Sequence, residues 1–502
     1  MNKVNRVNRM NKMNRVNKLT GLTLVTVMCI AIFIAGCKKT TDPDPVNPTE
    51  VGGQVIDLGD GSDAFEINQN MTLSYPNTYI LKGWVYVTEG NTLTVEAGVI
   101  IKGDKQTKGT LIVERGAKII AQGTKDKPIV MTSAQAAGNR KSGDWGGLII
   151  CGKARTNKGE QTIEGGVRSK HGGNDDNDNS GVLSYLRVEF AGIEYQTDNE
   201  INGITLGSVG RGTQIDHIQV SYSGDDSYEW FGGCVNAKYL VSYGCWDDDY
   251  DTDNGFSGKV QFALILRDPL IADQSASNGF ESDNDADGSS NSPNTAAVFA
   301  NVSIFGPVAN PQAYTDQGGV KGHHDATKVR FQAGLHLRRN TQLSIFNSLI
   351  AAFPIGVIVE NDKGSATQTH ATNGDLNITN CVIAGCVKNF QDAQYWTSGS
   401  VYNSTDAANA WGYTYFTRPE GNNRTYATLA ELGLGSNPLD LKATGLFPQS
   451  GSVLATGANW SHSKVSVGFD QVNYIGAFSP AETAGNSWLS GWTNFDPQNT
   501  KY

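Results

Sequence analysis

The sequence predicts an all-β protein, built as a single right-handed parallel β-helix solenoid with a short C-terminal cap. Short runs of alternating apolar and polar residues dominate the chain, each bounded by Gly, Asn or Asp, and amphipathic helical periodicity is nearly absent. Similar segments also return along the chain at unequal spacings. Glycine is abundant at 58 residues and proline is scarce at 15, which suits many tight turns between extended segments.

The internal repeats favour a β-helix over other repeat architectures. TLTVEAGVII at residues 92–101 returns eighteen residues later as TLIVERGAKI at 110–119. IFNSLIA at 345–351 returns thirty-three residues later as ITNCVIA at 378–384. Propeller blades and leucine-rich repeats have nearly constant lengths, whereas the strands of a β-helix stack in register while the loops between them vary. The unequal spacings therefore predict one continuous solenoid.

Asparagines are expected to stack at one corner of this solenoid. Asn301, Asn347 and Asn380 fall at equivalent turn positions of successive repeats. A column of Asn side chains can hydrogen-bond along the solenoid axis and satisfy the backbone groups of the turns.

The first 37 residues are expected to be an export signal and lipid anchor, not part of the fold. Residues 1–18 carry six positive charges and no acid, and an apolar run too short for a membrane span follows them. The run ends in Ile34-Ala35-Gly36-Cys37, which resembles the lipobox of bacterial lipoproteins. The resemblance implies that a signal peptide, residues 1–36, is removed and that Cys37 is lipidated. The expected organisation is a flexible tether at 37–55, the β-helix at 56–480 and a capping tail at 481–502.

The net charge and the expected lipid anchor together limit the classes of partner that the protein can bind. The residue after Cys37 is not Asp, which implies, by the same resemblance, an outer-membrane lipoprotein facing the periplasm or the cell surface. Loss of residues 1–36 takes the net charge from −10 to −16. Such an acidic surface disfavours nucleic acid and anionic lipid head groups and favours cations. The expected contact with the membrane is therefore the lipid anchor.

Two stretches resemble a known family. Residues 448–458 and 474–478 look like the closing coils of pectate-lyase-like right-handed β-helix proteins. Residues 226–233 with 236–238 look like uncharacterised Gram-negative β-helix lipoproteins. The resemblance covers residues 80–480 approximately and implies the fold. It implies little about activity, because β-helices host lyases, hydrolases, epimerases, adhesins and inert scaffolds.

Acidic residues are concentrated in one part of the chain. Fourteen carboxylates lie between Asp225 and Asp287, against three basic residues, Lys238, Lys259 and Arg267. Crowded carboxylates repel one another, and their pKa values rise unless a cation or donated hydrogen bonds compensate. Calcium, with its shell of oxygen ligands, is the cation expected here.

Three acidic loops supply the expected calcium ligands. The segment Asp283–Gly288 fits the first half of an EF-hand loop, although Asn294 stands where an EF-hand has its closing Glu. The alternative is a set of solvated turns rich in Asp, Asn and Gly. The expected metal ligands are Asp176, Asp178, Asp249, Asp251, Asp253, Asp283, Asp285 and Asp287.

A second set of residues suggests a ligand-binding surface. Aromatic residues interleave with the acids, as on surfaces where rings stack on sugars beside carboxylates that bind hydroxyl groups. His336 and Arg338 are expected to share one face of a strand, either as part of a site or as a plain polar surface. The expected ligand-binding residues are Glu229, Trp230, Trp246, Glu281, His336 and Arg338.

These observations favour a lipid-anchored, calcium-binding envelope or surface protein. It is expected to bind a ligand such as a glycan, or a partner such as a TonB-dependent outer-membrane receptor. The alternative is a polysaccharide-active enzyme, a lyase or a glycoside hydrolase, on the same β-helix; no catalytic residue is assigned. A bare structural scaffold is a third reading.

We predict that Cys37 is the acylated N-terminus of the mature protein, because it directly follows the apolar run. The intact mass of membrane-extracted protein should show loss of residues 1–36 and added acyl mass. The variant Cys37→Ala should carry no acyl group. A soluble, unacylated product from the unaltered chain would contradict the prediction.

Overall fold

The computed structural model describes residues 52–502 except 197–198, 315–329, 365 and 393–410. The described residues belong to one compact unit. Cys37 and the expected export signal lie outside them. Within the described part of the chain, no helix is both long enough and apolar enough to cross a bilayer.

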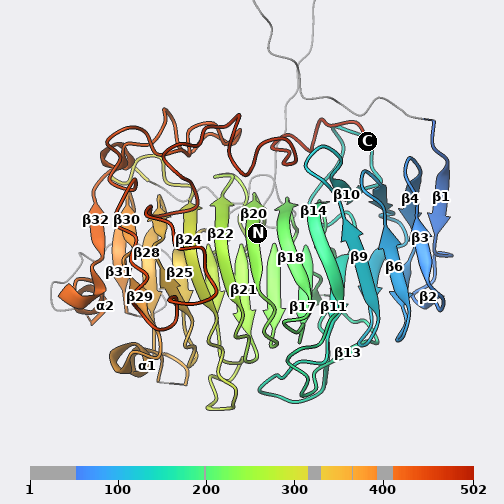
Figure 1. Ribbon diagram of the computed structural model, residues 1–502, viewed down its shortest axis with the longest axis horizontal. Helices are drawn as coiled ribbons and strands as arrows, with labels where there is room; N and C mark the ends of the chain where they lie inside the picture. The colour runs from blue at the N-terminus through green and yellow to red at the C-terminus, as the bar shows by residue number, and fades with distance from the viewer. Residues whose placement is uncertain (1–51, 197–198, 315–329, 365, 393–410) are drawn as a thin grey trace, which may run out of the picture. The chain divides into compact units, whose positions relative to one another are not determined.

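Parallel strands stack side by side along the solenoid (Figure 1) and make up its two long sheets. The 11-stranded sheet contains β2 (Phe65–Ile67), β5 (Trp84–Val87), β8 (Thr110–Val113), β11 (Gly147–Cys151), β17 (Ile204–Gly207), β19 (Tyr228–Phe231), β21 (Tyr250–Asp253), β23 (Phe280–Ser282), β25 (Ala333–Leu337), β28 (Ile355–Val359) and β31 (Lys388–Gln391). This architecture confirms the expected parallel β-helix.

The second long sheet has 17 strands. They are β1 (Val55–Leu58), β3 (Met71–Leu73), β4 (Thr78–Leu81), β6 (Thr92–Val95), β7 (Ile100–Gly103), β9 (Lys118–Gln122), β10 (Ile129–Ser133), β14 (Gly181–Glu189), β18 (Gln214–Ser221), β20 (Ala237–Tyr243), β22 (Lys259–Leu266), β24 (Val298–Phe305), β26 (Ser344–Phe346), β27 (Leu349–Ala351), β29 (Ile378–Thr379), β30 (Val382–Ala384) and β32 (Arg424–Tyr426).

Two short antiparallel pairs and a few helical turns complete the described elements. The pairs are β12 (Gln161–Thr162) with β13 (Lys170–His171), and β15 (Glu194–Gln196) with β16 (Asn199–Glu200). The helices are α1 (Thr367–Asn373), α2 (Trp411–Phe416) and two 3-10 turns, Pro419–Gly421 and Leu429–Leu432.

The core is a set of apolar columns that run along the solenoid. Alternate residues of each strand point inward, and register places like beside like in successive coils. One column, buried throughout, consists of Leu73, Val95, Ala121, Leu183, Ile215, Ala237, Val260, Phe299, Ile345 and Ile378.

The structure confirms one of the two quoted repeats and corrects the other. Ile345 pairs with Ile378, so the repeat of thirty-three residues is one coil. Thr92 instead pairs with Lys118, and Thr110 begins a strand of the other sheet. The repeat of eighteen residues therefore relates two faces of the solenoid, because any amphipathic strand ended by a glycine turn gives a similar sequence.

The expected asparagine column is present at a corner of the solenoid for Asn347 and Asn380. Asn301 does not join it, because its side-chain N–H donates to the carbonyls of Tyr474 and Gly476 at 3.0 and 3.2 Å. Asn380 donates a side-chain hydrogen bond of 2.6 Å to Asn347, and Asn422 donates one of 2.6 Å to Asn380. All three residues have a left-handed backbone, with φ of 50°, 57° and 47° for Asn347, Asn380 and Asn422. Asn tolerates that conformation better than most residues do, so backbone and side chain both favour it here.

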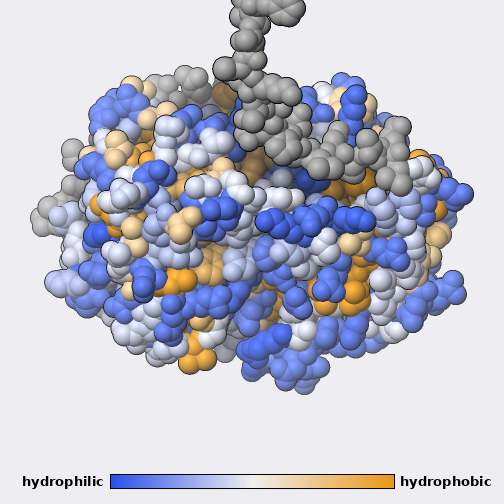
Figure 2. Space-filling model, turned by 45° about the horizontal axis from the view of Figure 1, so that its top comes forward, coloured by the Kyte–Doolittle hydropathy of each residue, from blue (hydrophilic) through white to orange (hydrophobic). Residues whose placement is uncertain are grey.

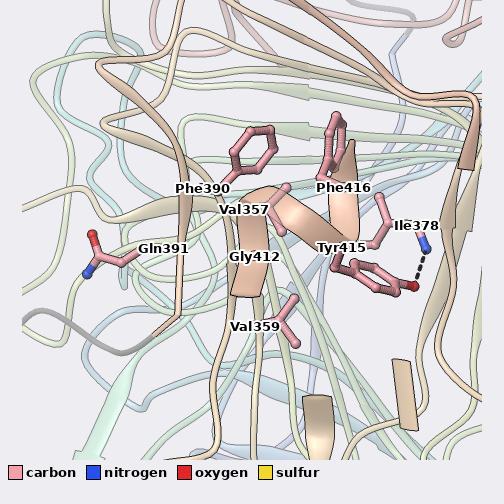
Figure 3. Close-up of a pocket in the computed structure, with 8 residues that line it drawn as sticks. All are labelled: Val357, Val359, Ile378, Phe390, Gln391, Gly412, Tyr415 and Phe416. Atoms are coloured by element: carbon pink, nitrogen blue, oxygen red, sulfur yellow. Dashed lines mark hydrogen bonds between the residues drawn. The ribbon is translucent and has the colours of Figure 1, made fainter. Parts of the chain in front are cut away.

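The helix α2 covers the last described coil. Its Phe416 ring lies 4.6 Å from the ring of Phe390, and the Tyr415 hydroxyl donates a hydrogen bond of 3.0 Å to the Leu376 carbonyl. Figure 3 shows the small apolar pocket between α2 and the coil beneath it, lined by Val357, Val359, Ile378, Phe390, Gln391, Gly412, Tyr415 and Phe416. No acid, histidine, lysine or arginine lines this pocket.

The C-terminal tail does not cap the end of the solenoid, so that expectation for residues 481–502 is wrong. After β32 the chain turns back along the side of the solenoid and ends near β10 (Figure 1). Trp492 packs edge-on against Tyr185 at 5.9 Å, and the Tyr502 hydroxyl donates a hydrogen bond of 2.6 Å to Glu189. The strand ladder accordingly ends at Tyr426 and not at residue 480.

The physical reason lies in the corner that the tail covers. There, stacked rings of Tyr185, His217 and Tyr239 form a column with centroid distances of 4.3 and 4.4 Å. These rings need an apolar cover, and the tail supplies Trp488 and Trp492. The outer surface on this side is mainly hydrophilic, with small scattered apolar areas (Figure 2).

We predict that Trp492→Ala lowers the free energy of unfolding by about 3–5 kcal/mol, because it empties a buried aromatic position. Urea unfolding followed by tryptophan fluorescence measures the change. The control is Val467→Ala in the same tail, at a side chain that is 73% exposed, which should change stability by less than about 0.5 kcal/mol. Equal, small effects of both substitutions would show that the tail does not pack on this corner.

Candidate functional site

Strand alternation separates acidic from aromatic residues in the middle of the 11-stranded sheet. Glu229 in β19, Asp251 in β21 and Glu281 in β23 are register partners, and His336 in β25 follows them. Their side chains form one column on the outer face of the sheet. The aromatic residues next to them point inward, because successive residues of a strand face opposite sides.

Burial overturns the expectation that Trp230, on β19, and Trp246, in the turn before β21, bind a sugar. Trp230 is 1% exposed and stacks on Phe256 in the core at 5.3 Å. Trp246 is buried as well. Rings and acids that interleave in sequence therefore do not share a surface.

A second column of polar side chains lies at the turns before these strands. The Asp226 carboxylate accepts a hydrogen bond of 2.8 Å from the backbone N–H of Asp248, and the Asp248 carboxylate accepts one of 2.5 Å from the N–H of Asn278. The Asn278 side-chain oxygen continues the ladder with a bond of 3.1 Å from the N–H of Ala333. Because a neutral Asn makes the same bond, the ladder does not require the charges of Asp226 and Asp248.

The acids on the C-terminal side of this region are neutralised by basic side chains. Arg338 pairs with both Glu281 and Asp283, and Arg339 pairs with Asp283 at 2.7 Å. Burial by itself raises the pKa of Glu281, but Arg338 and His336 outweigh it and lower that pKa to about 2. His336 is fully buried between Glu281, at 3.6 Å, and Glu360, at 3.3 Å.

These contacts decide whether two of the expected ligand-binding residues, His336 and Arg338, are accessible to a ligand. His336 and Arg338 do share the outer face of β25, with Leu335 and Leu337 in the core. However, the His336 ring has no exposure, and the guanidinium of Arg338 is occupied by Glu281 and Asp283. The structure therefore corrects their assignment: they compensate buried acids and are not open to a ligand.

Three acids on the N-terminal side have no such compensation among the described residues. Asp226, Glu229 and Asp251 place carboxylate oxygens within 4.8 Å of one another. Burial, and then neighbouring carboxylates, raise the pKa of all three well above the usual range. Among the described residues, no ion pair reaches any of the three. We call Asp226, Glu229 and Asp251 the acidic triad.

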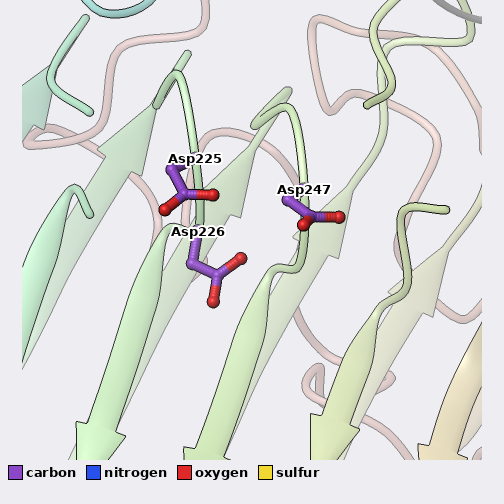
Figure 4. A group of neighbouring side chains, drawn as sticks. All are labelled: Asp225, Asp226 and Asp247. Carbon is purple, nitrogen blue, oxygen red and sulfur yellow. The ribbon is translucent and has the colours of Figure 1, made fainter. Parts of the chain in front are cut away.

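A second group of three carboxylates shares one member with the triad. Asp225, Asp226 and Asp247 also place oxygens within 4.8 Å of one another, and Figure 4 shows them on the turns of two adjacent coils. One coil of the solenoid takes about 22 residues here. Residues that far apart in sequence, such as Asp225 and Asp247, therefore meet on adjacent coils.

Two buried oxygen atoms at the triad lack a hydrogen-bond donor within the described residues. They are Oδ1 of Asp251 and Oδ1 of Asn202. Asn202 is itself buried and points toward the triad, since its side-chain N–H donates to Glu229. A buried acceptor without a donor is costly, so these oxygens favour a cation at this place.

The loop expected to be the main calcium site is occupied by other contacts. Asp283 pairs with the two arginines, and Asp285 accepts hydrogen bonds of 3.0 Å from the N–H groups of Asp287 and Ser289. The Asp287 side chain is 84% exposed, 3.5 Å from Lys363. The three carboxylates do not converge on one point, because Asp283 forms an ion pair with Arg338 of the next coil.

The other two loops are corrected in the same way. Asp176 pairs with Arg155, and the Asp178 carboxylate accepts a hydrogen bond of 3.3 Å from Ser180. Asp249 is buried against Arg267 at 2.7 Å and precedes the strand that carries Asp251 and Asp253. Of the eight expected metal ligands, Asp251 alone belongs to the triad; Asp226 and Glu229 join it from the preceding coil.

We predict that the protein without calcium becomes less stable as the pH rises from 5 to 8. Burial and then neighbouring acids raise the pKa of Asp247 and Asp253 to about 7. The folded state therefore holds protons that the unfolded state has already released above pH 4, and this stabilisation is lost as the pH passes 7.

Melting temperatures in chelator at each pH measure the effect. The double variant Asp247→Asn with Asp253→Asn should show a shallower fall than the unaltered protein, because it removes two of the titrating groups. Parallel pH profiles of the two proteins would contradict the assignment.

Comparison with known proteins agrees with this architecture. Residues 65–425 match the model of the pectate-lyase like beta helix domain, a span that covers most of the chain. No curated protein matches the sequence, and no solved structure matches it. The chain belongs to the family of pectate-lyase-like β-helix domains.

Proposed function

We propose that this protein is a lipid-anchored envelope or surface protein that binds calcium at the acidic triad. The observation that supports this most is the lack of compensation at Asp226, Glu229 and Asp251, next to acids that are fully paired. In the same ladder, the neutral side chain of Asn278 makes the equivalent hydrogen bond, so the turn does not need a carboxylate at that position. Three carboxylates held together with no basic partner in the described part of the chain are best explained by a metal ion.

Calcium fits the triad better than other common cations. All the candidate ligand atoms are oxygens, which suit calcium and magnesium and not zinc or copper. Asn202, whose side-chain N–H donates to Glu229, carries a neutral amide oxygen that has no hydrogen-bond donor among the described residues. The ligands come from three successive coils, and calcium tolerates such irregular geometry better than magnesium does.

The ligand we propose is an anionic glycan, held through the bound cation. Calcium with open coordination positions binds the carboxylate and hydroxyl oxygens of uronic acids, and it would offset the repulsion of an acidic protein surface. The buried position of Trp230 argues against recognition by ring stacking. An outer-membrane location through Cys37, and capture of the glycan for a TonB-dependent receptor, complete the proposal.

Glycoside hydrolysis is the second candidate function. Glu229 and Asp251 lie on adjacent strands, with oxygens within 4.8 Å of each other. Retaining glycosidases hold their two carboxyl groups about 5–5.5 Å apart, and a raised pKa suits a general acid. Lyase chemistry is less well supported, because Arg338, a candidate base on this face, is paired with Glu281 and Asp283.

We predict that calcium raises the melting temperature of chelator-treated protein and that Glu229→Gln with Asp251→Asn abolishes the rise. Binding to the folded state stabilises it by roughly 2.7 kcal/mol at a hundredfold excess over the dissociation constant. The matched control is Asp287→Asn, which removes an exposed carboxylate of the rejected loop and should leave the rise intact. Loss of the rise in the control alone would place the metal in that loop.

Polygalacturonate separates binding from hydrolysis. We expect the unaltered protein to retain this polymer on a column in calcium and to release it in chelator, without generating reducing ends. Calcium-independent formation of reducing ends, lost in Glu229→Gln, would favour the hydrolase instead. If the protein neither retains the polymer nor generates reducing ends, an anionic glycan of this type is excluded as the ligand.

A further inference from the structure

Arg267 lies buried among the turns that carry the acidic residues. It is 1% exposed. Its Nη1 donates a hydrogen bond of 2.9 Å to the Cys245 carbonyl, and its Nη2 donates to the carbonyls of Asp247 and Asn278. One guanidinium thus joins the turn before β21 to the turn before β23.

The charge of Arg267 is matched within its own contacts. Its Nε lies 2.7 Å from Oδ2 of Asp249, which is also fully buried. Oδ1 of Asp249 accepts a hydrogen bond of 2.5 Å from the Ser242 hydroxyl. The ion pair is therefore neutral as a unit, and no ion pair among the described residues joins Arg267 to the acidic triad.

A buried ion pair of this kind is a poor source of stability. Apolar residues of similar volume often replace such a pair with no loss, or with a gain, of stability. What an apolar pair cannot do is donate to three turn carbonyls at once. The fork of an arginine serves this geometry, and lysine, a point charge with a flexible stem, does not.

The residues that Arg267 holds lead directly to the triad. With its carbonyl fixed, Asp247 sets the direction of Asp248, whose N–H binds the carboxylate of Asp226. Asp248 is fixed on its other side by the N–H of Asn278, whose own carbonyl also binds Arg267. Asp251 follows at the second residue of β21.

We infer that Arg267, paired with Asp249, is a positioning residue for the cation site. The inference rests on the proposed function. Arg267 fixes the turn before β21, which leads to Asp251 and whose Asp248 N–H holds the carboxylate of Asp226. Asp249 neutralises Arg267, so that the triad keeps its charge for the cation. Groups that orient metal ligands without touching the metal commonly change metal affinity about 10- to 100-fold when altered.

Arg267→Lys tests this inference, with Arg140→Lys as the matched control. Arg140 is also a buried arginine that donates to backbone carbonyls, at 2.6 Å to Pro497 and 2.8 Å to Thr500, and it lies in the contact with the tail. Both variants lose comparable hydrogen bonds. Calcium affinity is measured by titration calorimetry, well below the melting temperature of each variant.

Arg267→Lys should bind calcium about tenfold more weakly than the unaltered protein or more weakly still, whereas Arg140→Lys should bind with unchanged affinity at a similarly reduced melting temperature. If Arg267→Lys binds calcium with the same affinity as Arg140→Lys, the inference is overturned, but the proposed cation site is not. No calcium binding by the unaltered protein would overturn both.

A second variant covers the case in which Arg267→Lys does not fold. Asp249→Asn keeps an acceptor for Ser242 and leaves the charge of Arg267 unmatched beside the acids. We expect weaker calcium binding here too, because the arginine then offsets part of the charge that attracts the ion. Unchanged affinity in Asp249→Asn would overturn the role assigned to the pair.

Discussion

The structure depends on the lateral pairing of each strand with its equivalent in the next coil. Register sets the same residue position of successive coils side by side, and strand alternation decides which positions face the core. Apolar residues gain from this arrangement, as the column from Leu73 to Ile378 shows. Asparagines gain as well, because Asn347, Asn380 and Asn422 bond along the axis.

Acidic residues are the case in which the same stacking is unfavourable. Register places Glu229, Asp251 and Glu281 in one column, where burial and then neighbouring carboxylates raise the pKa of Glu229 and Asp251. The chain resolves the conflict at Glu281 by placing Arg338 and His336 in the following coil. At Glu229 and Asp251 it provides no such partner within the described residues. This contrast inside a single column is what separates a candidate site from a merely acidic surface.

The two sides of the acidic region also differ in how their basic residues are used. Arg338 and Arg339 neutralise acids on the outer face, whereas Arg267 is buried beneath the turns and has its charge matched by Asp249. Arg338 and Arg339 thus cancel the charge of neighbouring acids, whereas Arg267 holds in place the turns that lead to the acidic triad. The arrangement is consistent with a rigid frame around a charged site, since the ligands sit on strands and hydrogen-bonded turns of adjacent coils.

The sequence alone determined the fold, because alternation, turn residues and unequal repeats are local signals that a β-helix requires together. It also located the acidic region and the asparagine column. Tertiary structure decided which acids are available. Asp283, Asp285 and Asp287 form the most regular motif in the sequence, but an arginine 55 residues later takes Asp283, and no local pattern reveals such a pairing. Asp226, Glu229 and Asp251 do not form a metal-binding motif in the sequence, because they meet only when two coils lie side by side. The tail likewise carries the aromatic residues of a cap, yet only the folded solenoid offers the stacked corner on which they pack.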